Sequence, residues 1–317
     1  MKPIPDFQDV RDAARRIAPY IHHTPILTCQ TLDRMSGAEL YFKPENLQKV
    51  GAFKARGACN AVFALTAEQA ARGVATHSSG NHGQALAYAA RLRGIPATVV
   101  MPEDAPPVKV AAVRGYGATI VWAGTQPLDR ERTLETVRQD TGATFIHPSN
   151  NFYVIAGQGT AALELLQDTP DLDVVLTPVG GGGLLAGTAL AVSGTAPGTR
   201  TLAAEPETVD DAARSLHDGR IYPPTGGETV ADGLRTFLGD INFPIIRRHV
   251  TDILTVSERG IVDAMRRVWE RMKIVIEPSS AVPVAALFEH PDVFSGQRVG
   301  IVLSGGNVDL DHLPWRP

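Results

Sequence analysis

Residues 73–102 read GVATHSSGNHGQALAYAARLRGIPATVVMP, and this stretch indicates the fold class. The β-rich run VATHS is followed by the helix-forming stretch HGQALAYAARLRG and then by a second β-rich run, ATVVMP. A strand, a helix and a strand in this order form a βαβ unit, whose two strands lie parallel in one sheet. The stretch therefore predicts an α/β fold.

The same alternation continues toward the C-terminus. It includes VKVAAVRGYG, ATIVWAG, LDRERTLETVRQD and ATFIHP, and a second series of β-rich and helical stretches begins near Asn151. Two series of this kind predict two lobes, each with a parallel twisted sheet flanked by helices.

The composition is that of an ordinary globular protein. The chain has 317 residues, of which 44% are hydrophobic and 20% charged, and its formal net charge is -4. There is no basic stripe, so neither a nucleic acid nor a membrane surface is expected as a partner. The longest apolar runs fall far short of the roughly 20 residues that a membrane span needs. We expect a small molecule as the partner.

The cysteines and the N-terminal residues bear on the cellular compartment. Only Cys29 and Cys59 are present, too few for a disulfide framework or a thiolate metal site. The first residues, MKPIPDFQDV, lack the apolar run of a signal peptide. We therefore expect a cytoplasmic protein.

Four consecutive glycines, Gly180 to Gly183, stand between the β-rich run VVLTPV and the helix-forming stretch LLAGTALAV. Glycine lets the backbone approach a ligand closely, and the N-terminus of the following helix attracts a phosphate. A tight turn is the simpler interpretation, but it does not need four glycines. The kind of phosphate stays open, because Gly181, Gly183 and Ala186 also fit the dinucleotide motif G-x-G-x-x-A, with Glu205 near the position of its ribose-binding acid.

Two further motifs are ambiguous when they are taken alone. Lys54 lies in GAFKARGA, among small residues that leave room for a ring. A lysine that forms a Schiff base must be partly desolvated, yet most lysines are solvated surface residues. The stretch SSGNH, residues 78–82, leads from a β-rich run into a helix, which is both a binding position and an ordinary place for a helix cap.

Taken together, GAFKARGA, SSGNHG, VGGGGLLAG and LSGGN resemble the fold-type II pyridoxal-phosphate family of serine/threonine dehydratases and serine racemases. The resemblance spans nearly the whole chain, whereas a dehydrogenase would leave three of these motifs unexplained. It implies the two-lobed fold of the tryptophan synthase β type. Residues 1–64 and 152–317 would form a large cofactor-binding domain, residues 65–151 a small domain, and the protein would be a homodimer.

The resemblance also implies a role for individual residues. Lys54 would carry pyridoxal 5'-phosphate and act as the base at the substrate Cα, with Phe53 beside the ring. Asn81 would bind the cofactor's 3-hydroxyl and Ser304 its pyridine nitrogen. A serine hydroxyl does not hold this nitrogen protonated as a carboxylate would, which favours elimination over transamination. The phosphate would be held by Gly180, Gly181, Gly182, Gly183 and the backbone of Leu184.

The function implied is that of a threonine/serine ammonia-lyase, which converts L-threonine or L-serine into a 2-oxo acid and ammonia. Serine racemase is one alternative, because Ser79 stands where serine racemases carry a serine that can return a proton on the face opposite Lys54. L-threo-3-hydroxyaspartate ammonia-lyase is the other alternative.

The substrate carboxylate is expected at the start of the helix that SSGNHG opens, near the backbone N–H groups of Ser78, Ser79 and His82. Arg130 lies where serine racemases place an arginine that holds the ligand, although a charged helix surface would explain it equally well. If Arg130 reaches the site, it favours a dicarboxylic substrate.

The run AAEPETVDDAARS contains clustered carboxylates, which are hard ligands of the kind that Mg²⁺ or Ca²⁺ prefers. Acidic residues at a helix start also complement the helix dipole without any metal. In racemase-like relatives this pattern binds a divalent ion near the phosphate loop. The resemblance therefore implies a structural ion held by Glu205, the carbonyl of Val209 and Asp211.

Overall fold

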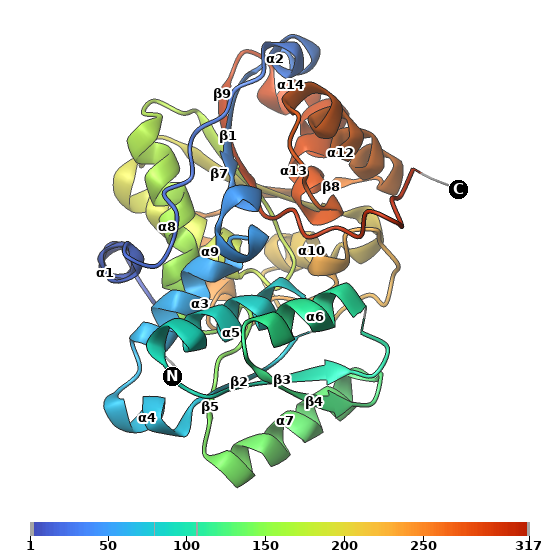
Figure 1. The fold of residues 1–317 in the computed structure, drawn as a ribbon. Helices are drawn as coiled ribbons and strands as arrows, with labels where there is room; N and C mark the ends of the chain where they lie inside the picture. The colour runs from blue at the N-terminus through green and yellow to red at the C-terminus, as the bar shows by residue number, and fades with distance from the viewer. Residues whose placement is uncertain (1–2, 79, 106, 316–317) are drawn as a thin grey trace.

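The computed structural model describes residues 3–78, 80–105 and 107–315. These residues form two sheets, one of five strands and one of four, and within each sheet the paired strands run parallel. Figure 1 shows the five-stranded sheet in the upper part of the molecule and the four-stranded sheet in the lower part. The α/β fold with two parallel sheets predicted from the sequence is confirmed.

We call the five-stranded sheet and the helices around it the large lobe. Its strands lie in the order β1 (Glu39–Pro44), β9 (Arg298–Leu303), β6 (Val174–Pro178), β7 (Arg200–Pro206) and β8 (Asp252–Val256). Its α-helices are α1 (Phe7–Ile17), α2 (Gln30–Ser36), α8 (Phe152–Asp168), α9 (Gly183–Thr195), α10 (Asp211–Asp218), α11 (Phe243–His249), α12 (Glu258–Met272), α13 (Pro278–Glu289) and α14 (Pro291–Phe294). Short 3-10 turns are η1 (Glu45–Leu47), η2 (Lys49–Gly51), η3 (Glu207–Val209) and η4 (Asp232–Leu234).

We call the four-stranded sheet and its helices the small lobe. Its strands lie in the order β4 (Thr119–Ala123), β3 (Ala97–Pro102), β2 (Val74–His77) and β5 (Thr144–Phe145). Its helices are α4 (Ala67–Arg72), α5 (Asn81–Arg93), α6 (Pro107–Gly115) and α7 (Pro127–Thr141).

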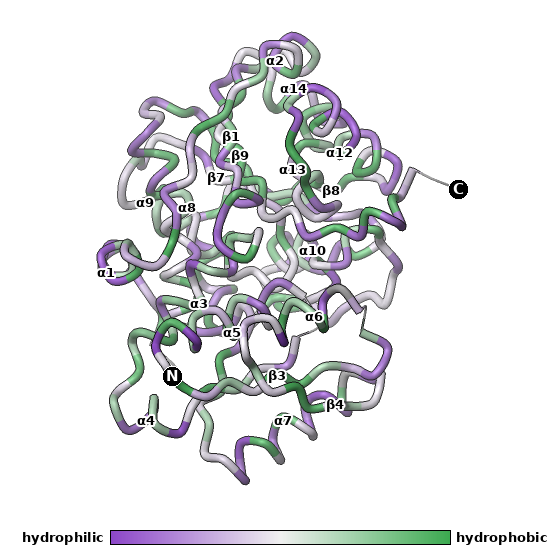
Figure 2. The backbone as a smooth tube through the Cα atoms, in the orientation of Figure 1, coloured by the Kyte–Doolittle hydropathy of each residue, from purple (hydrophilic) through white to green (hydrophobic). Residues whose placement is uncertain are grey.

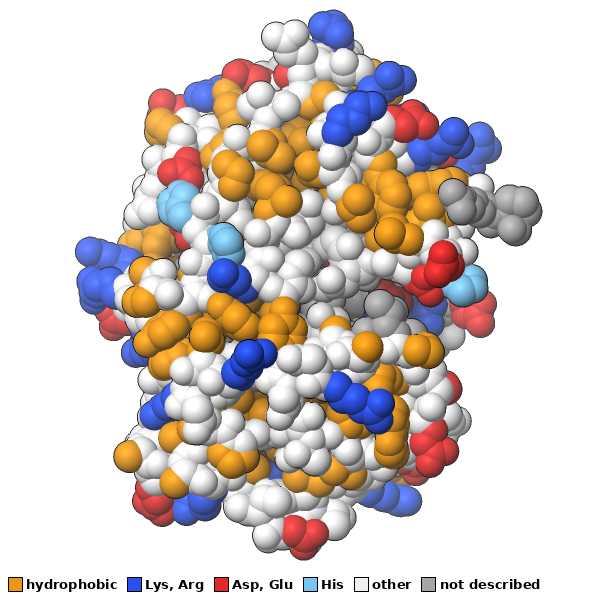
Figure 3. Space-filling view, in the orientation of Figure 1, with side chains coloured by type: hydrophobic (Ala, Val, Ile, Leu, Met, Phe, Trp, Pro, Cys, Tyr) orange, Lys and Arg blue, Asp and Glu red, His pale blue; other side chains and the backbone are white. Residues whose placement is uncertain are grey.

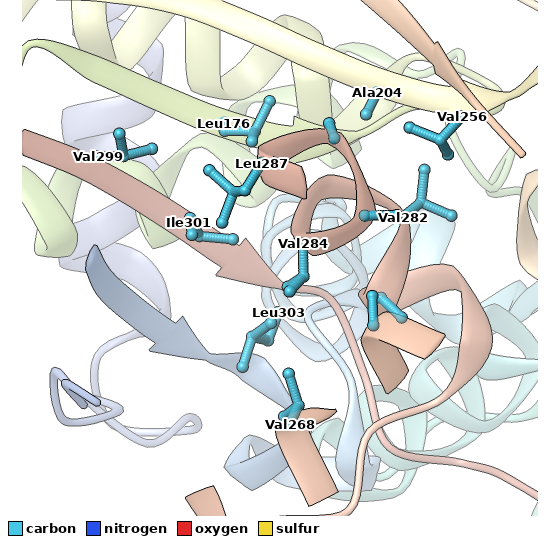
Figure 4. Packing of buried hydrophobic residues seen from close by; sticks show 14 of the residues in the cluster. Leu176, Ala204, Val256, Val268, Val282, Val284, Leu287, Val299, Ile301 and Leu303 are labelled. Carbon is cyan, nitrogen blue, oxygen red and sulfur yellow. The ribbon is translucent and has the colours of Figure 1, made fainter. Parts of the chain in front are cut away.

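The large sheet is covered on both faces. Successive strand residues point to opposite sides, so Val175 packs against α8 and α9 whereas Leu176 joins the cluster around α13. Figure 4 shows Val284 and Leu287 of α13 among the side chains of the strands. Figure 2 shows α13 as largely hydrophobic, as expected for a helix enclosed by the core.

The small sheet is also covered by helices on both faces. Ala75 and Val100 pack with Leu134 of α7 on one face, and Val99 packs with Leu86 of α5 on the other face. The nearly continuous burial of residues along β2 and β3 is therefore explained by helices on both faces.

Helix α3 (Lys54–Phe63) lies between the lobes. It packs against α5 of the small lobe and α8 of the large lobe, and Cys59 and Val62 belong to the same buried cluster as the small sheet. The exact division of the chain at residues 64 and 152 stays a prediction, because α3 contributes to the packing of both lobes.

The carboxyl ends of parallel strands meet at one edge of a sheet, where ligands commonly bind. In the large lobe the glycine loop follows β6 and Ser304 follows β9; in the small lobe Ser78 follows β2. On the face shown in Figure 3, Lys and Arg side chains are scattered among acidic and polar ones. Within the described residues, no helix combines the length and the apolar character needed to cross a membrane.

Candidate active site

Lys54 is held beside the end of strand β9. The residue before it, Phe53, donates its backbone N–H to the carbonyl of Ser304 at 3.0 Å, and Ala52 forms an isolated antiparallel bridge with Gly305. Helix α3 then begins at Lys54 itself. The backbone therefore brings together the predicted attachment lysine and the serine predicted to meet the pyridine nitrogen, although 250 residues separate them in the sequence.

The amine of Lys54 is poorly solvated. Its Nζ donates to the carbonyl of Pro148 at 2.9 Å and lies 5.0 Å from the centre of the Phe53 ring. Desolvation lowers the pKa of Lys54 to about 8, and the negative charge of Glu277 opposes this effect. A lysine with this pKa supplies far more neutral amine near neutral pH than a solvated lysine does.

The glycine loop leads directly into helix α9. Gly182 is the N-cap residue and has a φ of +76°, in the left-handed region, and a Cβ at this position would lie 2.6 Å from Leu238. A glycine cap has no side chain to occupy the first N–H groups of the helix, so they can bind an anion. The side chain of Asn242 fixes the loop from outside by donating to the carbonyl of Gly181 at 2.7 Å.

The segment after β5 joins Lys54 to the glycine loop. Pro148 accepts the hydrogen bond from Lys54, and the next residue, Ser149, is buried against the loop. A Cβ added to Gly181 would lie only 2.5 Å from Ser149 Oγ, and one added to Gly183 would lie 2.9 Å from the Ser149 backbone, so the two segments are in close contact. The lysine and the phosphate cradle predicted from separate motifs therefore belong to one site.

Ser304 is 3% exposed and has a defined polar neighbour. Its Oγ lies 3.1 Å from Ser280 Oγ, which donates to the carbonyl of Gly305 at 2.7 Å and accepts from the backbone N–H of Gly305 at 2.6 Å. Because Ser280 uses its only hydroxyl hydrogen on Gly305, Ser304 is the donor between the two hydroxyls. Ser304 therefore presents a neutral hydroxyl at the end of β9, and this hydroxyl must turn from Ser280 to donate to a ligand.

Asn81 begins helix α5 and contacts the large lobe. Its Nδ2 donates to both carboxylate oxygens of Glu277, at 2.9 and 3.1 Å, and its Oδ1 accepts from Asn307 Nδ2 at 2.8 Å. Asn307 also donates to the carbonyl of Val50, shortly before Lys54. These contacts place Asn81 at the same site as the residues of the large lobe.

The start of α5 has further polar groups. Ser78 Oγ accepts from the backbone N–H of Gly80 at 3.2 Å, and His82 Nε2 contacts the carbonyl of Ile146 at 3.0 Å. Desolvation, followed by the positive charge of Lys54, lowers the pKa of His82 to about 3. His82 is therefore neutral and uses its Nε2–H as the donor. Ser79, the predicted racemase residue, lies outside the described residues.

Arg130 lies in the first turn of α7 and is partly buried. Its buried Nε has no hydrogen-bond partner among the described residues. Arg130 is close to His77, the last residue of β2: desolvation lowers the pKa of His77, and the charge of Arg130 lowers it further. Since His77 directly precedes Ser78, the charge of Arg130 acts near the loop at which the substrate was expected.

The predicted metal ligands Glu205 and Asp211 are both buried. Glu205 accepts from the backbone N–H groups of Ala212 and Ala213 at 3.3 and 2.5 Å, and desolvation raises its pKa to about 8. Desolvation also raises the pKa of Asp211 to about 6, and Asp211 Oδ2 has no partner among the described residues. Two such carboxylates fit a cation.

Side chains alone do not define a metal centre at this place. Among the described residues, no group of three or more His, Cys, Asp or Glu side chains could hold a metal ion. The predicted set differs, because it combines two carboxylates with the backbone carbonyl of Val209, which closes η3. The ion therefore stays a prediction.

Comparisons with known proteins identify the family. The model of the pyridoxal-phosphate dependent enzymes matches residues 17–305. The chain belongs to this family. It is 51% identical over 312 residues to the beta-hydroxyaspartate dehydratase of Paracoccus denitrificans (strain Pd 1222), covering 98% of this chain and 99% of the relative.

Solved structures agree with this assignment. The crystal structure of serine racemase from Dictyostelium discoideum matches with a TM-score of 0.93 and 49% identity, over 96% of this chain and 99% of that one. The structure of maize serine racemase matches with a TM-score of 0.95 and 46% identity, over 98% and 95%. A crystal structure of a threonine deaminase matches with a TM-score of 0.91 and 48% identity, over 96% and 99%. The resemblance predicted from the four motifs is confirmed, and this pyridoxal-phosphate dependent enzyme is similar to both racemases and dehydratases.

The residues of the site fit the cofactor of the family. The desolvated amine of Lys54 suits an aldehyde, and the glycine-capped N-terminus of α9 suits a phosphate. The buried hydroxyl of Ser304 suits a ring nitrogen. Each of these groups stands on a different element, and backbone contacts join the elements.

Sequence reasoning missed several residues of the site. Glu277 and Ser149 follow no recognisable motif, whereas Asn307 closes the quoted motif LSGGN and could have been named from it. Glu277 directly precedes the proline that begins α13 and resembles an ordinary acidic residue at a helix start. Only its contact with Asn81, 196 residues away, reveals its place.

Proposed function

We propose that this chain is an ammonia-lyase that acts on L-threo-3-hydroxyaspartate, forming a 2-oxo dicarboxylic acid and ammonia. The observation that carries the proposal is the partly buried Arg130, whose Nε is unpaired among the described residues and whose charge acts on His77. A guanidinium whose Nε lacks a partner among the described residues is suited to a second carboxylate. L-serine and L-threonine have no second carboxylate, so this substrate fits better than our leading expectation from the sequence.

The relatives support the same choice. The chain is 51% identical to a beta-hydroxyaspartate dehydratase over almost its full length, and it is 46% identical to an L-threo-3-hydroxyaspartate ammonia-lyase of Saccharomyces cerevisiae. A serine racemase at 49% identity supports racemisation as a second candidate activity. In that case Ser79 would return the proton on the face opposite Lys54.

In the mechanism that we propose, Lys54 attaches the cofactor and then accepts the proton from the substrate Cα. When bound, pyridoxal phosphate withdraws electrons from Cα and makes this proton more acidic. Desolvation serves Lys54 in both roles, because it increases the neutral fraction of the amine near neutral pH. Phe53 bounds the space in which the ring would lie.

The remaining residues orient the reactants. The N–H groups of Gly180, Gly181, Gly182, Gly183 and Leu184 would bind the phosphate at the start of α9. Asn81 Nδ2 would donate to the ring oxygen and Ser304 Oγ to the ring nitrogen. A neutral donor at this nitrogen leaves electron density at Cα, and that favours loss of the β-hydroxyl, which takes up a proton and leaves as water. The substrate α-carboxylate would lie at the start of α5, near Ser78, Ser79 and His82.

A substrate panel tests the proposal. The cofactor-loaded protein is incubated with L-threo-3-hydroxyaspartate, L-serine and L-threonine, and 2-oxo acid and D-amino acid are measured by chiral chromatography. We expect the highest kcat/KM of elimination for 3-hydroxyaspartate. A higher value for L-serine or L-threonine would contradict the proposed substrate, and abundant D-serine would support the racemase.

Arg130→Ala tests the observation behind the proposal. It should lower kcat/KM for 3-hydroxyaspartate by about 10-fold to 100-fold, because a charged hydrogen bond is lost, and leave the value for L-serine nearly unchanged. Arg132→Ala is the matched control, since Arg132 is an exposed residue of the same helix. Equal losses on both substrates would show that Arg130 does not read the second carboxylate.

We also propose that Glu205, Asp211 and the carbonyl of Val209 hold a structural Mg²⁺ or Ca²⁺. The support is the pair of buried carboxylates, Glu205 near the end of β7 and Asp211 at the start of α10, the second with an oxygen that has no partner among the described residues. Hard carboxylate and carbonyl oxygens are the ligands that these ions prefer.

A further inference from the structure

Glu277 is buried directly before helix α13, with 7% of its surface exposed. It is the N-cap residue of this helix, yet its side chain makes no cap hydrogen bond to the helix. The carboxylate turns instead toward Asn81 Nδ2, and Oε2 also accepts from the backbone N–H of Asn307 at 3.2 Å. These donors compensate for the loss of water around a buried carboxylate.

The contacts of Asn307 and Glu277 hold the amide of Asn81 in one orientation. Asn307 Nδ2 donates to the carbonyl of Val50 at 2.8 Å, which identifies that end of the Asn307 amide as nitrogen. The same nitrogen donates to Asn81, so the atom that it meets must be the oxygen Oδ1. The opposite end of the Asn81 amide, the NH₂ group, therefore faces the carboxylate of Glu277.

The surrounding backbone is shaped for this carboxylate. A Cβ added to Gly305 would lie 2.8 Å from Glu277 Oε1, so a side chain there would displace it. The backbone N–H of Glu277 donates to the carbonyl of Gly305 at 3.0 Å, which fixes Glu277 at the end of β9. The backbone of Glu277 is thus hydrogen-bonded to the segment that contains Ser304. Its side chain contacts Asn81 of the small lobe.

Charged groups from neighbouring elements act on Glu277. Glu277 interacts electrostatically with Lys54 at the start of α3, Lys109 of α6 and Asp232 of η4. Lys109 and Asp232 also form an ion pair between the lobes, with an N···O distance of 2.5 Å. Burial raises the pKa of Glu277 to about 7, against the hydrogen bond from Asn81. Glu277 is therefore hydrogen-bonded to the start of α5, and its charge acts on the attachment lysine.

We propose that Glu277 is a positioning residue that orients the Asn81 amide so that its NH₂ group, rather than its oxygen, faces the ring oxygen of the cofactor. An amide nitrogen carries two hydrogens, so one can bind the carboxylate while the other binds the ring oxygen. The same contact ties α5 of the small lobe to α13 of the large lobe. The inference rests on the proposed cofactor contact of Asn81 and is independent of the proposed substrate.

Glu277→Gln tests this role, because the substitution keeps the shape but removes the charge that selects the NH₂ end of Asn81. We expect the affinity for pyridoxal phosphate to fall about tenfold, measured by titrating the apoprotein and following the absorbance of the cofactor. An unchanged affinity overturns the proposal. Circular dichroism of the apoprotein verifies that the variant is folded.

A double-mutant cycle with Asn81→Ala distinguishes positioning from a direct effect. If Glu277 acts through Asn81, then Glu277→Gln should change the cofactor affinity less than about twofold in the Asn81→Ala background. An equal tenfold loss in both backgrounds contradicts the proposal. If Glu277→Gln does not fold, Glu277→Asp replaces it in the cycle with the same expectations, since its carboxylate is withdrawn from Asn81 by one methylene.

Glu289→Gln is the matched control, because Glu289 lies at the other end of α13 and accepts hydrogen bonds from Ser257 at 2.9 and 2.6 Å. We expect it to leave the cofactor affinity unchanged, and a loss equal to that of Glu277→Gln would indicate a general effect of stability and overturn the proposal. No substrate enters these measurements. Their failure is therefore distinguishable from a failure of the proposed 3-hydroxyaspartate activity.

Discussion

The amine of Lys54 determines how the protein takes up its cofactor. Only the neutral amine attacks an aldehyde, and desolvation lowers the pKa of Lys54 from 10.5 to about 8. The rate at which the apoprotein incorporates pyridoxal phosphate should therefore rise with pH and reach half of its maximum near pH 8. Stopped-flow absorbance over a pH series measures this midpoint, and a midpoint near 10.5 would indicate a solvated lysine.

The same measurement responds to Glu277. Its negative charge raises the pKa of Lys54, so Glu277→Gln should move the midpoint of incorporation to lower pH. Lys54→Ala should remove both the incorporation and the turnover. Retained activity in that variant would contradict the proposed mechanism.

The carboxylates at residues 205 and 211 predict a response to divalent ions. An ion that binds only the folded protein stabilises it by about 2.7 kcal/mol at a hundredfold excess over Kd, so Mg²⁺ or Ca²⁺ should raise Tm. Glu205→Gln should abolish this rise, whereas Glu207→Gln, at an exposed neighbouring residue, should retain it. Thermal unfolding with ion or with chelator measures the difference, and an equal response of all three proteins would exclude the proposed site.

At the scale of residues, the sequence indicated those parts of the site that are carried by local motifs. Lys54, Asn81 and Ser304 each lie in a short pattern rich in small residues, since backbone must approach the ligand closely there. Glu277 could not be found in this way. Its role depends on a contact between two lobes, and a single acidic residue before a helix has an ordinary explanation in the helix dipole.

At the scale of elements, the glycine loop depends on one left-handed residue. Gly182→Ala would force a Cβ to within 2.6 Å of Leu238 at a φ of +76°. The substitution should lower the free energy of unfolding by about 1 to 3 kcal/mol and weaken cofactor binding as well, because the first turn of α9 shifts. Urea unfolding and cofactor titration measure the two effects.

Gly198→Ala is the control for this substitution. No heavy atom lies within 4 Å of a Cβ placed at Gly198, and its φ lies outside the left-handed region. We expect a change in stability of less than about 1 kcal/mol and unaltered cofactor binding. If Gly182→Ala behaved like this control, the loop would not need its left-handed turn.

Elements were predictable where periodicity was strong. The β-rich runs VATHS and ATVVMP correspond to β2 and β3, because their residues are buried between helices on both faces. The packing partners of a helix were not predictable. Most residues of helix α3 are buried, and its apolar pattern does not reveal that the helix lies between two lobes.

At the scale of the whole molecule, α3 is anchored by a buried ionic network. Arg56 is fully buried and donates to both carboxylate oxygens of Glu45, at 2.7 and 2.8 Å, and of Glu164, also at 2.7 and 2.8 Å. Burial raises the pKa of Glu164, but the hydrogen bonds and charge of Arg56 outweigh this effect and lower it. The network joins α3, η1 and α8. Its arginine, Arg56, follows Lys54 by two residues in the sequence.

Arg56→Met should therefore destabilise the whole protein. It leaves the buried carboxylate of Glu45 without its cation, which costs about 3 to 5 kcal/mol of the free energy of unfolding. Arg56→Lys should rescue little, because one ammonium group cannot bind two carboxylates in bidentate fashion. The midpoint of urea unfolding measures both variants.

The exposed pair of Arg72 and Glu68 provides the comparison. Their side chains are 46% and 81% exposed, so Arg72→Met should cost less than about 1 kcal/mol in the same assay. A similar small cost for Arg56→Met would mean that Glu45 and Glu164 find other partners or water once the arginine is gone. A large cost would show that the helix carrying Lys54 is held in place by charge as well as by the apolar packing that the sequence pattern predicts.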